Sequence, residues 1–509
     1  MCGIAGMWGT SDRIALRQVM DALVHRGPDD QGTYSAVNSV GMLGHRRLSI
    51  MDPCGGHQPI ERIGEDCAIV ANGEIYNFPE LRADLANRHS FRTCSDSESV
   101  LHLYREAGVD TAKQLDGMFA LAIADGDELY LARDPLGIKP LYYGQHDGGL
   151  VFASELKALF GHAEEVREFP PGTWFHSRHG FQRYYEVPDG SPIPGSQAEH
   201  LRNVRSAVEQ AVVKRLMSDV PVGAFLSGGL DSSIIAAIAR LHLEELHTFS
   251  VGTEGSRDIW AARLVARHLG TVHHEYIFTA EEALAALPEI LYSLESFDQD
   301  LVRSAIPCYF ASRLASEFVK VILTGEGADE LFAGYDYYRT ITCPRQLHRE
   351  LRRSVCSLHN INLQRVDRLT MAHSIEGRVP FLDLDLIRVA QSIPPELKLF
   401  ENDDGQIIEK WILRKAFEDL LPAEIVWRDK EQFDEGSGTT DFLADMVGRW
   451  MTTQEAEQYG ETHRASRLRS LEECVYHKLL VESFPRTSCV LGNVARWSDR
   501  PELGDAKDE

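Results

Sequence analysis

The sequence predicts a two-domain α/β protein, and three observations lead to this fold class. A chain of 509 residues is too long for a single hydrophobic core. Residues 188–198 are rich in proline, glycine and serine, which is typical of a linker. Beyond this linker, short apolar runs of strand character alternate with helical segments, the pattern of a parallel sheet. We therefore expect a first domain at 1–187, a second at 199–499 and a charged tail at 500–509.

The composition excludes several classes of partner. A net charge of -25 argues against nucleic acids and anionic membranes, because both require a basic face. The chain has no run of 18 apolar residues and no charged-then-apolar leader, so we expect neither a membrane span nor a secretory signal. Its nine cysteines are odd in number and scattered without a Cys-x-x-Cys pair, which predicts neither a disulfide framework nor a zinc site. We expect a cytoplasmic protein.

The first domain opens with Met1-Cys2-Gly3. Removal of Met1 would leave a thiol and a free α-amine on Cys2, and an amine with a pKa near ~8 can take the thiol proton as an intramolecular general base. A cysteine can also fall at position 2 by coincidence, so this residue alone decides nothing. Further candidates are Arg47, Asn72-Gly73-Glu74 after an apolar strand that begins at Cys67, and Asp96 at the start of a helix. Each could instead be a surface or turn position.

In order and in spacing, Cys2, Arg47, Asn72-Gly73-Glu74 and Asp96 resemble the N-terminal-nucleophile (Ntn) glutaminase domain of class II amidotransferases. The resemblance implies an Ntn-hydrolase αββα sandwich. It implies that Cys2 is the nucleophile and that the Asn72 side chain and the Gly73 N–H form the oxyanion hole. Arg47 would hold the carboxylate of glutamine, and Glu74 and Asp96 would receive its ammonium.

The second domain is organised around a turn with the sequence Leu226-Ser227-Gly228-Gly229-Leu230-Asp231-Ser232-Ser233. An apolar strand precedes it and a helix follows, so its glycines and hydroxyls lie where unpaired backbone N–H groups and the helix dipole favour an anion. The Gly-Lys-Ser/Thr ending of the common phosphate loop is missing. The alternative is a serine-rich capping turn, but that would leave Asp231 unexplained, because a carboxylate beside phosphates is typically a Mg²⁺ ligand.

A second polar loop, Thr324-Gly325-Glu326-Gly327-Ala328-Asp329-Glu330, follows an apolar strand at 319–323. The carboxyl ends of parallel strands meet at one edge of a sheet, where ligands bind, and Val251 ends another such strand. Three acidic residues beside phosphates would need a cation. A solvated acidic loop is the alternative.

Together the two loops resemble the asparagine synthetase superfamily, and the resemblance spans nearly the whole chain except roughly the last thirty residues. It implies a parallel-sheet, adenine nucleotide α-hydrolase-like (ATP pyrophosphatase, PP-loop) domain. Asp231 and Asp329 would bind Mg²⁺, Glu326 would position the intermediate, and Lys410 would stabilise developing negative charge. The residues implied to hold ATP are Leu226, Ser227, Gly228, Gly229, Asp231, Ser232, Val251, Thr324 and Gly325.

The function implied is that of a glutamine-hydrolysing asparagine synthetase, an ATP-dependent ligase. Glutamine would give glutamate and ammonia, a shielded passage would carry the ammonia, and aspartate would be activated as β-aspartyl-AMP to yield asparagine, AMP and pyrophosphate. The family also suggests a homodimer.

One stretch departs from the family pattern. This chain has Gln299-Asp300-Leu301-Val302-Arg303 where the family commonly has two threonines before Ile/Val-Arg. The carboxylate of Asp300 keeps open a related adenylating amide synthetase that acts on a different carboxylic acid in secondary metabolism. A catalytically silent binding protein is a further alternative, which retention of Met1 would favour. The polar tail at 500–509 is expected to be disordered.

Overall fold

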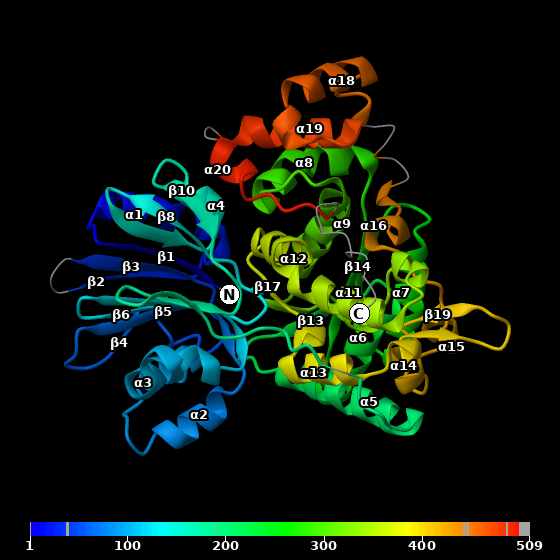
Figure 1. Ribbon diagram of the computed structural model, residues 1–509, viewed down its shortest axis with the longest axis horizontal. Coiled ribbons are helices and arrows are strands. Elements are labelled where there is room, and N and C mark those ends of the chain that lie inside the picture. The colour runs from blue at the N-terminus through cyan, green and yellow to red at the C-terminus, as the bar shows by residue number, and fades with distance from the viewer. Residues whose placement is uncertain are drawn as a thin grey trace, which may run out of the picture.

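The computed structural model describes residues 2–36, 40–190, 192–440, 443, 447–484 and 487–497. Two α/β domains lie side by side, the first drawn in blue to cyan and the second in green to red (Figure 1). Met1 and residues 500–509 fall outside the described residues, and so do the expectations about removal of Met1 and about the tail.

The first domain contains two antiparallel sheets. The first sheet has the order β10 (Glu164–Glu168), β8 (Tyr142–His146), β9 (Gly149–Ala153), β1 (Cys2–Trp8), β3 (Gly41–Arg47), β2 (Asp30–Ser35). The second has the order β12 (Gly180–Arg183), β11 (Thr173–His176), β7 (Glu128–Arg133), β6 (Gly117–Asp125), β5 (Cys67–Ile75), β4 (Ile60–Glu61).

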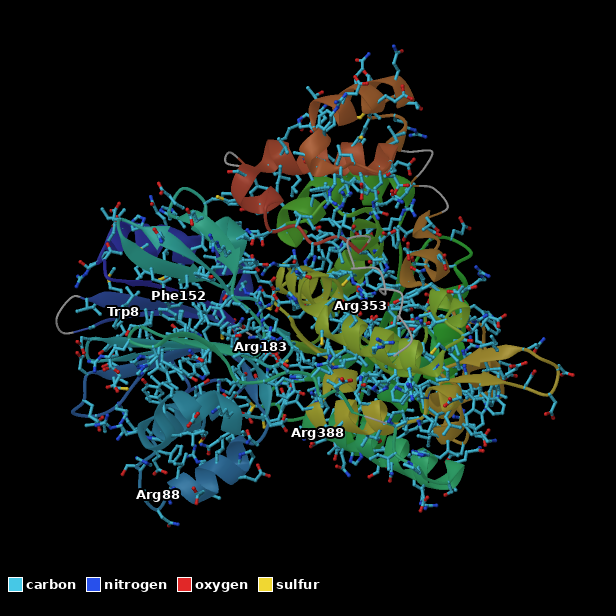
Figure 2. The ribbon with its side chains drawn as sticks, viewed as in Figure 1. Trp8, Arg88, Phe152, Arg183, Arg353 and Arg388 are labelled. Carbon is cyan, nitrogen blue, oxygen red and sulfur yellow. The ribbon has the colours of Figure 1, made fainter. Side chains whose placement is uncertain are left out.

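The first domain has three apolar layers, one between the two sheets and one between each sheet and the helices that cover it. Trp8 and Phe152 belong to the core between the two sheets, where they meet Val70 and Leu131 of the second sheet (Figure 2). The helices α1 (Arg13–Asp21) and α4 (Leu156–Leu159) cover the outer face of the first sheet, and α2 (Phe78–Leu85) and α3 (Asp96–Ala107) cover that of the second. The αββα sandwich implied by the sequence is confirmed.

Strand β5 is longer than its apolar run at 67–70 predicts. It continues to Ile75, and each residue from Cys67 to Ile75 lies opposite a residue of β6. The ladder satisfies backbone groups whatever the side chains are, so the polar residues Asn72 and Glu74 are carried into the interior on a regular strand. The site residues therefore stand on a rigid element.

The second domain is built on a parallel sheet, as the alternation of strands and helices predicts. Its order is β15 (Val272–Ile277), β14 (His247–Gly252), β13 (Val222–Phe225), β16 (Val321–Leu323), β17 (Glu376–Arg378). Its helices include α5 (Gln197–Lys214), α6 (Leu230–His242), α7 (Arg257–Leu269), α8 (Ala280–Leu294), α9 (Gln299–Ala315), α11 (Pro344–Cys356), α12 (Asn362–Met371) and α13 (Leu384–Ser392).

Further elements complete this domain. A hairpin of β18 (Leu399–Glu401) and β19 (Ile407–Glu409) precedes α14. The remaining helices are α10 (Ala328–Phe332), α14 (Trp411–Ala416), α15 (Ala423–Val426), α16 (Phe433–Gly436), α18 (Thr453–Thr462), α19 (Leu471–Ser483) and α20 (Thr487–Leu491). The last three form the orange and red group at the top of Figure 1.

Helix α5 begins at Gln197, inside the stretch predicted as linker. The side chain of Ser196 accepts from the Glu199 N–H and the Glu199 carboxylate accepts from the Ser196 N–H, so a capping box fixes the helix start. The helix runs to Lys214, so the second domain begins within the predicted linker and not at residue 199.

Buried charges join the two domains. The guanidinium of Arg26 lies 2.6 Å from Glu155 in its own domain and 2.7 Å from Asp367 on α12 of the other. Arg368 likewise pairs with Glu295 at 2.9 Å and donates to the Ser154 carbonyl across the boundary. Apolar residues also cross the boundary, since Leu48 and Ile138 of the first domain belong to the same buried core as residues of the second. Among the described helices, none is long and apolar enough to span a bilayer.

Candidate functional site

The predicted nucleophile lies at the start of a buried strand. Cys2 opens β1 directly opposite Arg47, the last residue of β3. Its backbone N–H donates to Oδ1 of Asn72 over 2.9 Å, which joins the first sheet to β5 of the second. Burial raises the pKa of the Cys2 thiol, so a base is needed to form the thiolate.

Asn72 has an unused donor. Its Nδ2 group is buried and has no hydrogen-bond partner among the described residues, while its Oδ1 is fixed by Cys2. Gly73 has φ +143, and a Cβ there would overlap the Met118 carbonyl. The backbone at this point thus requires glycine. A free amide donor fixed next to Cys2 is the arrangement that an oxyanion hole needs.

Arg47 is held by carbonyl oxygens. Its guanidinium donates to the carbonyls of Met51, Asp52 and Pro53 over 3.1, 2.7 and 3.2 Å. A Cβ on Gly56 would lie 2.7 Å from Nη2, so glycine there makes room for the guanidinium. Neutral partners orient Arg47 without cancelling its charge, which suits it to a ligand carboxylate.

Glu74 and Asp96 are buried carboxylates on adjacent elements, β5 and α3. Burial, with Glu376 and Asp96 nearby, raises the pKa of Glu74 well above its ordinary value, and burial also raises that of Asp96. Asp96 accepts from the N–H of Ile75 over 2.8 Å and is thereby fixed beside Glu74. Both would gain from a cationic ligand, as an ammonium is.

The second group of predicted residues lines one cavity of about 440 Å³. It opens at the carboxyl ends of β13, β14 and β16, the edge at which parallel sheets bind ligands. Gly228 does not line it, because its φ of +74 turns it toward α7, where a Cβ would overlap Ala261. The predicted residues that do line it are Leu226, Ser227, Gly229, Asp231, Ser232, Val251, Thr324, Gly325, Glu326, Asp329 and Lys410.

Lys410 lies between the two predicted metal ligands. Its Nζ is 2.5 Å from Asp231 Oδ2 and 2.6 Å from Asp329 Oδ1. A second cation, Lys430, lies 2.9 Å from Asp329 and 4.0 Å from Asp231. Against the effect of burial, the two lysines lower the pKa of Asp329 below its ordinary value. Four charges thus alternate at the floor of the cavity.

The backbone of Lys410 is strained. Its φ of 52 is in the left-handed region, at the residue just before α14. For a residue with a side chain this costs on the order of 1–3 kcal/mol, and such strain persists where the surrounding structure demands it. With this backbone conformation, the buried ammonium of Lys410 reaches both Asp231 and Asp329.

The cavity suits Mg²⁺ only together with phosphates. Oδ1 of Asp231 is buried and accepts no hydrogen bond from the described residues, so one oxygen ligand is available. In the described part of the chain, no group of three or more His, Cys, Asp or Glu side chains could hold a metal ion. A magnesium ion here would therefore take further ligands from bound phosphates and water.

Glu326 is ion-paired with Arg365 of α12, which also lines the cavity. Glu330, one turn further on, is buried and accepts from the Tyr335 hydroxyl over 2.6 Å. Burial and the neighbouring Asp329 raise the pKa of Glu330 to about 7. The loop thus holds one carboxylate paired with arginine and one readily protonated.

Asp300 lies in the first turn of α9 and lines the cavity with its side chain 48% exposed. Its contact with Arg469 is 3.4 Å long, whereas Arg469 approaches Asp298 to 3.0 Å and Glu473 to 2.6 Å. The charge of Asp300 is therefore only partly offset by the protein and remains available to a ligand.

Several residues of both sites were not singled out from the sequence. Arg365 and Lys430 line the second cavity, and Arg378 lies 3.5 Å from Glu74. All three lie in the part of the chain over which the family resemblance extends, and that was the available signal. Lys430 lies 101 positions from Asp329 and Arg365 lies 39 positions from Glu326, so spacing could not identify them.

Comparisons with known proteins agree with this geometry. The model of the glutamine amidotransferase domain matches residues 1–185, and that of asparagine synthase matches 203–352 and 344–482. Asparagine synthetase [glutamine-hydrolyzing] 1 of Arabidopsis thaliana is 39% identical over 96% of this chain and 88% of its own. The Triphysaria versicolor enzyme is 43% identical over 86% and 78%. The chain belongs to the family of glutamine-hydrolysing asparagine synthetases.

Proposed function

We propose that this protein makes asparagine from aspartate, ATP and glutamine through two sites in one chain. Two observations together carry the proposal: Cys2 lies next to the free amide of Asn72, and Lys410 bridges Asp231 and Asp329 in the cavity. The first arrangement suits amide hydrolysis and the second suits chemistry on phosphates. The alternative acceptor acid and the silent binding protein have no support in the names of the relatives.

In the first site, Arg47 would bind the carboxylate of glutamine while Glu74 and Asp96 bind its ammonium. The Cys2 thiolate attacks the side-chain carbonyl carbon, and Asn72 and Gly73 stabilise the oxyanion. Ammonia leaves, and water then releases glutamate from the thioester. The α-amine of a mature N-terminal Cys2 would accept the thiol proton, which the raised pKa of that thiol makes necessary.

In the second site, the turn at 226–233 would hold the phosphates of ATP. A β-carboxylate oxygen of aspartate attacks the α-phosphorus and pyrophosphate leaves, after which ammonia displaces AMP from the acyl carbon. Lys410 and Lys430 would balance the negative charge that develops on the phosphates. Glu326, held by Arg365, would orient the acyl adenylate.

Magnesium is the cofactor that we propose, with Asp231 and Asp329 as its protein ligands. Bound there, it would neutralise the phosphates of ATP as a Lewis acid. Lys410 and Lys430 contact the same carboxylates, so these lysines would shift toward the phosphates when ATP and the ion bind.

Ammonia would cross between the domains alongside β16 and β17. Strand β17 begins beside the first site, where the charge of Glu376 helps to raise the pKa of Glu74. Strand β16 leads at Thr324 into the loop that lines the cavity of the second site. Transfer without release keeps ammonia unprotonated and therefore nucleophilic. We further propose a homodimer that acts in the cytoplasm, in keeping with the family and with scattered, unpaired cysteines.

The test is an incubation of the purified protein with ATP, Mg²⁺, aspartate and either glutamine or ammonium. Equal amounts of asparagine, AMP and pyrophosphate are expected from both nitrogen sources, with an equal amount of glutamate from glutamine. In the reaction with glutamine, formation of glutamate without AMP would refute aspartate as the acceptor, and formation of AMP without glutamate would refute the glutaminase.

A further inference from the structure

Arg378 is a fully buried arginine between the two sites, on the strand β17 at the domain boundary. Its Nε lies 2.6 Å from Glu376, and its Nη1 donates to the carbonyls of Arg215 and Met217 over 2.7 and 2.5 Å. These bonds fix the plane of the guanidinium from within the second domain. The remaining nitrogen, Nη2, is turned toward the first domain.

Nη2 of Arg378 lies 3.5 Å from Oε1 of Glu74. Neither Nη2 nor the other Glu74 oxygen, Oε2, has a hydrogen-bond partner among the described residues, although both are buried. Unsatisfied buried polar groups are rare in folded proteins and are commonly explained by a ligand or a functional role. The free Oε2 of Glu74 can therefore accept from the ammonium of glutamine, while Nη2 of Arg378 stays next to Oε1 and orients the carboxylate.

The backbone of the same residue touches the second site. The carbonyl of Arg378 accepts from the N–H of Thr324 over 2.9 Å, and Arg378 lies opposite Leu323 in the ladder of β16 and β17. Thr324, Gly325 and Glu326 follow directly and line the cavity. Thus Arg378 contacts both Glu74, which is predicted to bind glutamine, and Thr324, the first residue of the loop at 324–330.

We propose that Arg378 is a positioning residue for glutamine binding, through which the second domain orients Glu74. The same residue anchors the loop at 324–330, which lines the cavity of the second site. The proposal rests on the function proposed above. It assigns part of the glutamine site to the synthetase domain, so that an intact domain boundary is a requirement for glutamine affinity.

Several charges face Glu74. Glu376 on β17 and Asp96 on α3 disfavour its ionised form, and Arg378 and the amino terminus of the chain favour it. Burial is the largest influence and raises the pKa of Glu74. Loss of the Arg378 charge would raise that pKa further, so Glu74 would be neutral over a wider pH range and would bind ammonium less well.

The experiment compares Arg378→Lys and Arg378→Gln with a matched control, Arg368→Lys. Arg368 is also fully buried and crosses the boundary, but its hydrogen bonds go to Glu295 and the Ser154 carbonyl. Both Arg378 variants should raise KM for the substrate glutamine by a factor at least about tenfold larger than the factor by which they change the ammonia-dependent rate. The effect of Arg378→Lys should be smaller than that of Arg378→Gln. The control Arg368→Lys should change the glutamine-dependent and the ammonia-dependent rates by the same factor.

The pH profile separates positioning from mere stability. In the wild type, kcat/KM for glutamine should fall as pH decreases through the raised pKa of Glu74, because the carboxylate becomes protonated. In Arg378→Gln this acidic limb should move to higher pH, and in Arg378→Lys it should lie between the two. An unchanged limb in a folded Arg378→Gln protein would overturn the proposal.

If neither Arg378 variant folds, Glu376→Gln decides the question. This isosteric change removes the carboxylate that competes for Arg378 and that disfavours ionised Glu74. The acidic limb should then move to lower pH, and no movement would refute the proposal. Ammonia-dependent formation of asparagine by the wild type tests the proposed function separately, so the two failures are distinguishable.

Discussion

Nζ of Lys410 lies 2.5 Å from Oδ2 of Asp231, across 179 positions of the chain. The same ammonium reaches Asp329 at 2.6 Å, so the turn after β13, the loop after β16 and the start of α14 meet at one buried charge. With the fixed backbone of Lys410, this contact sets the floor of the cavity in which we place the phosphates of ATP.

Replacement of Lys410 by alanine should strongly slow synthesis of asparagine and spare hydrolysis of glutamine. The change leaves Asp231 and Asp329 without their shared cation and removes a charge aimed at the phosphates. The rate of AMP formation should fall by about 10²–10³-fold, the range for loss of one electrostatic stabiliser. Release of glutamate from glutamine should stay within about threefold. Lys415→Ala, an exposed lysine paired with Glu418, is the control and should retain both rates.

Gly334→Ala should have the same selective effect without a change of charge. A Cβ at this position would overlap Oδ1 of Asp329 and Cε of Lys410, so it would push the two groups apart. Formation of AMP should fall at least about tenfold. Gly460→Ala has open space around its Cβ and lies in α18, where alanine is the better helix former. Equal AMP formation by the two variants would contradict the assigned geometry.

Cys2→Ala should lose glutamine-dependent synthesis completely and keep synthesis from ammonium. The substitution removes the nucleophile but leaves the second domain intact, and it fills the same buried strand position with a small residue. Asparagine formation is followed with each nitrogen source in turn. Cys356→Ala, at an exposed cysteine, should retain both activities. Glutamate release by the Cys2 variant would exclude Cys2 as the nucleophile.

Asp300→Asn should weaken the binding of aspartate and leave the binding of ATP nearly unchanged. The half-exposed carboxylate of Asp300 lines the cavity and is only partly offset by Arg469, so it can accept the ammonium of the substrate. KM for aspartate should rise about tenfold, equivalent to about 1.4 kcal/mol, while KM for ATP changes by less than about twofold. Asp336→Asn is the control, since Asp336 also lines the cavity but is 80% exposed. A lower KM for aspartate would show that Asp300 repels the substrate.

The fold was predictable because its signals are local. The apolar run before Ser227 and the helical residues after Ser233 predict the strand and helix that the structure shows at Val222–Phe225 and Leu230–His242. The structure differs at two element ends, one set by a long-range strand pairing and one by a local helix cap. Pairing with β6 extends β5 to Ile75, and the Ser196–Glu199 capping box starts α5 at Gln197.

The sites were predictable in their residues but not in their contacts. The resemblance supplied Asp231, Asp329 and Lys410, and the structure brings them together. It gave no sign that Lys410 bridges both carboxylates or that Arg378 reaches Glu74 from the other domain. Such ion pairs join residues on separate elements, and no periodicity or turn chemistry encodes them.

The most direct test of the account is isotope transfer, read by mass spectrometry, from [amide-¹⁵N]glutamine and [β-carboxyl-¹⁸O₂]aspartate in one reaction with ATP. If the two sites act as proposed, asparagine carries ¹⁵N and keeps one ¹⁸O, and AMP gains the other ¹⁸O in its phosphate. If AMP gains no ¹⁸O, or if asparagine forms without ¹⁵N, then adenylation of aspartate or transfer from glutamine is wrong.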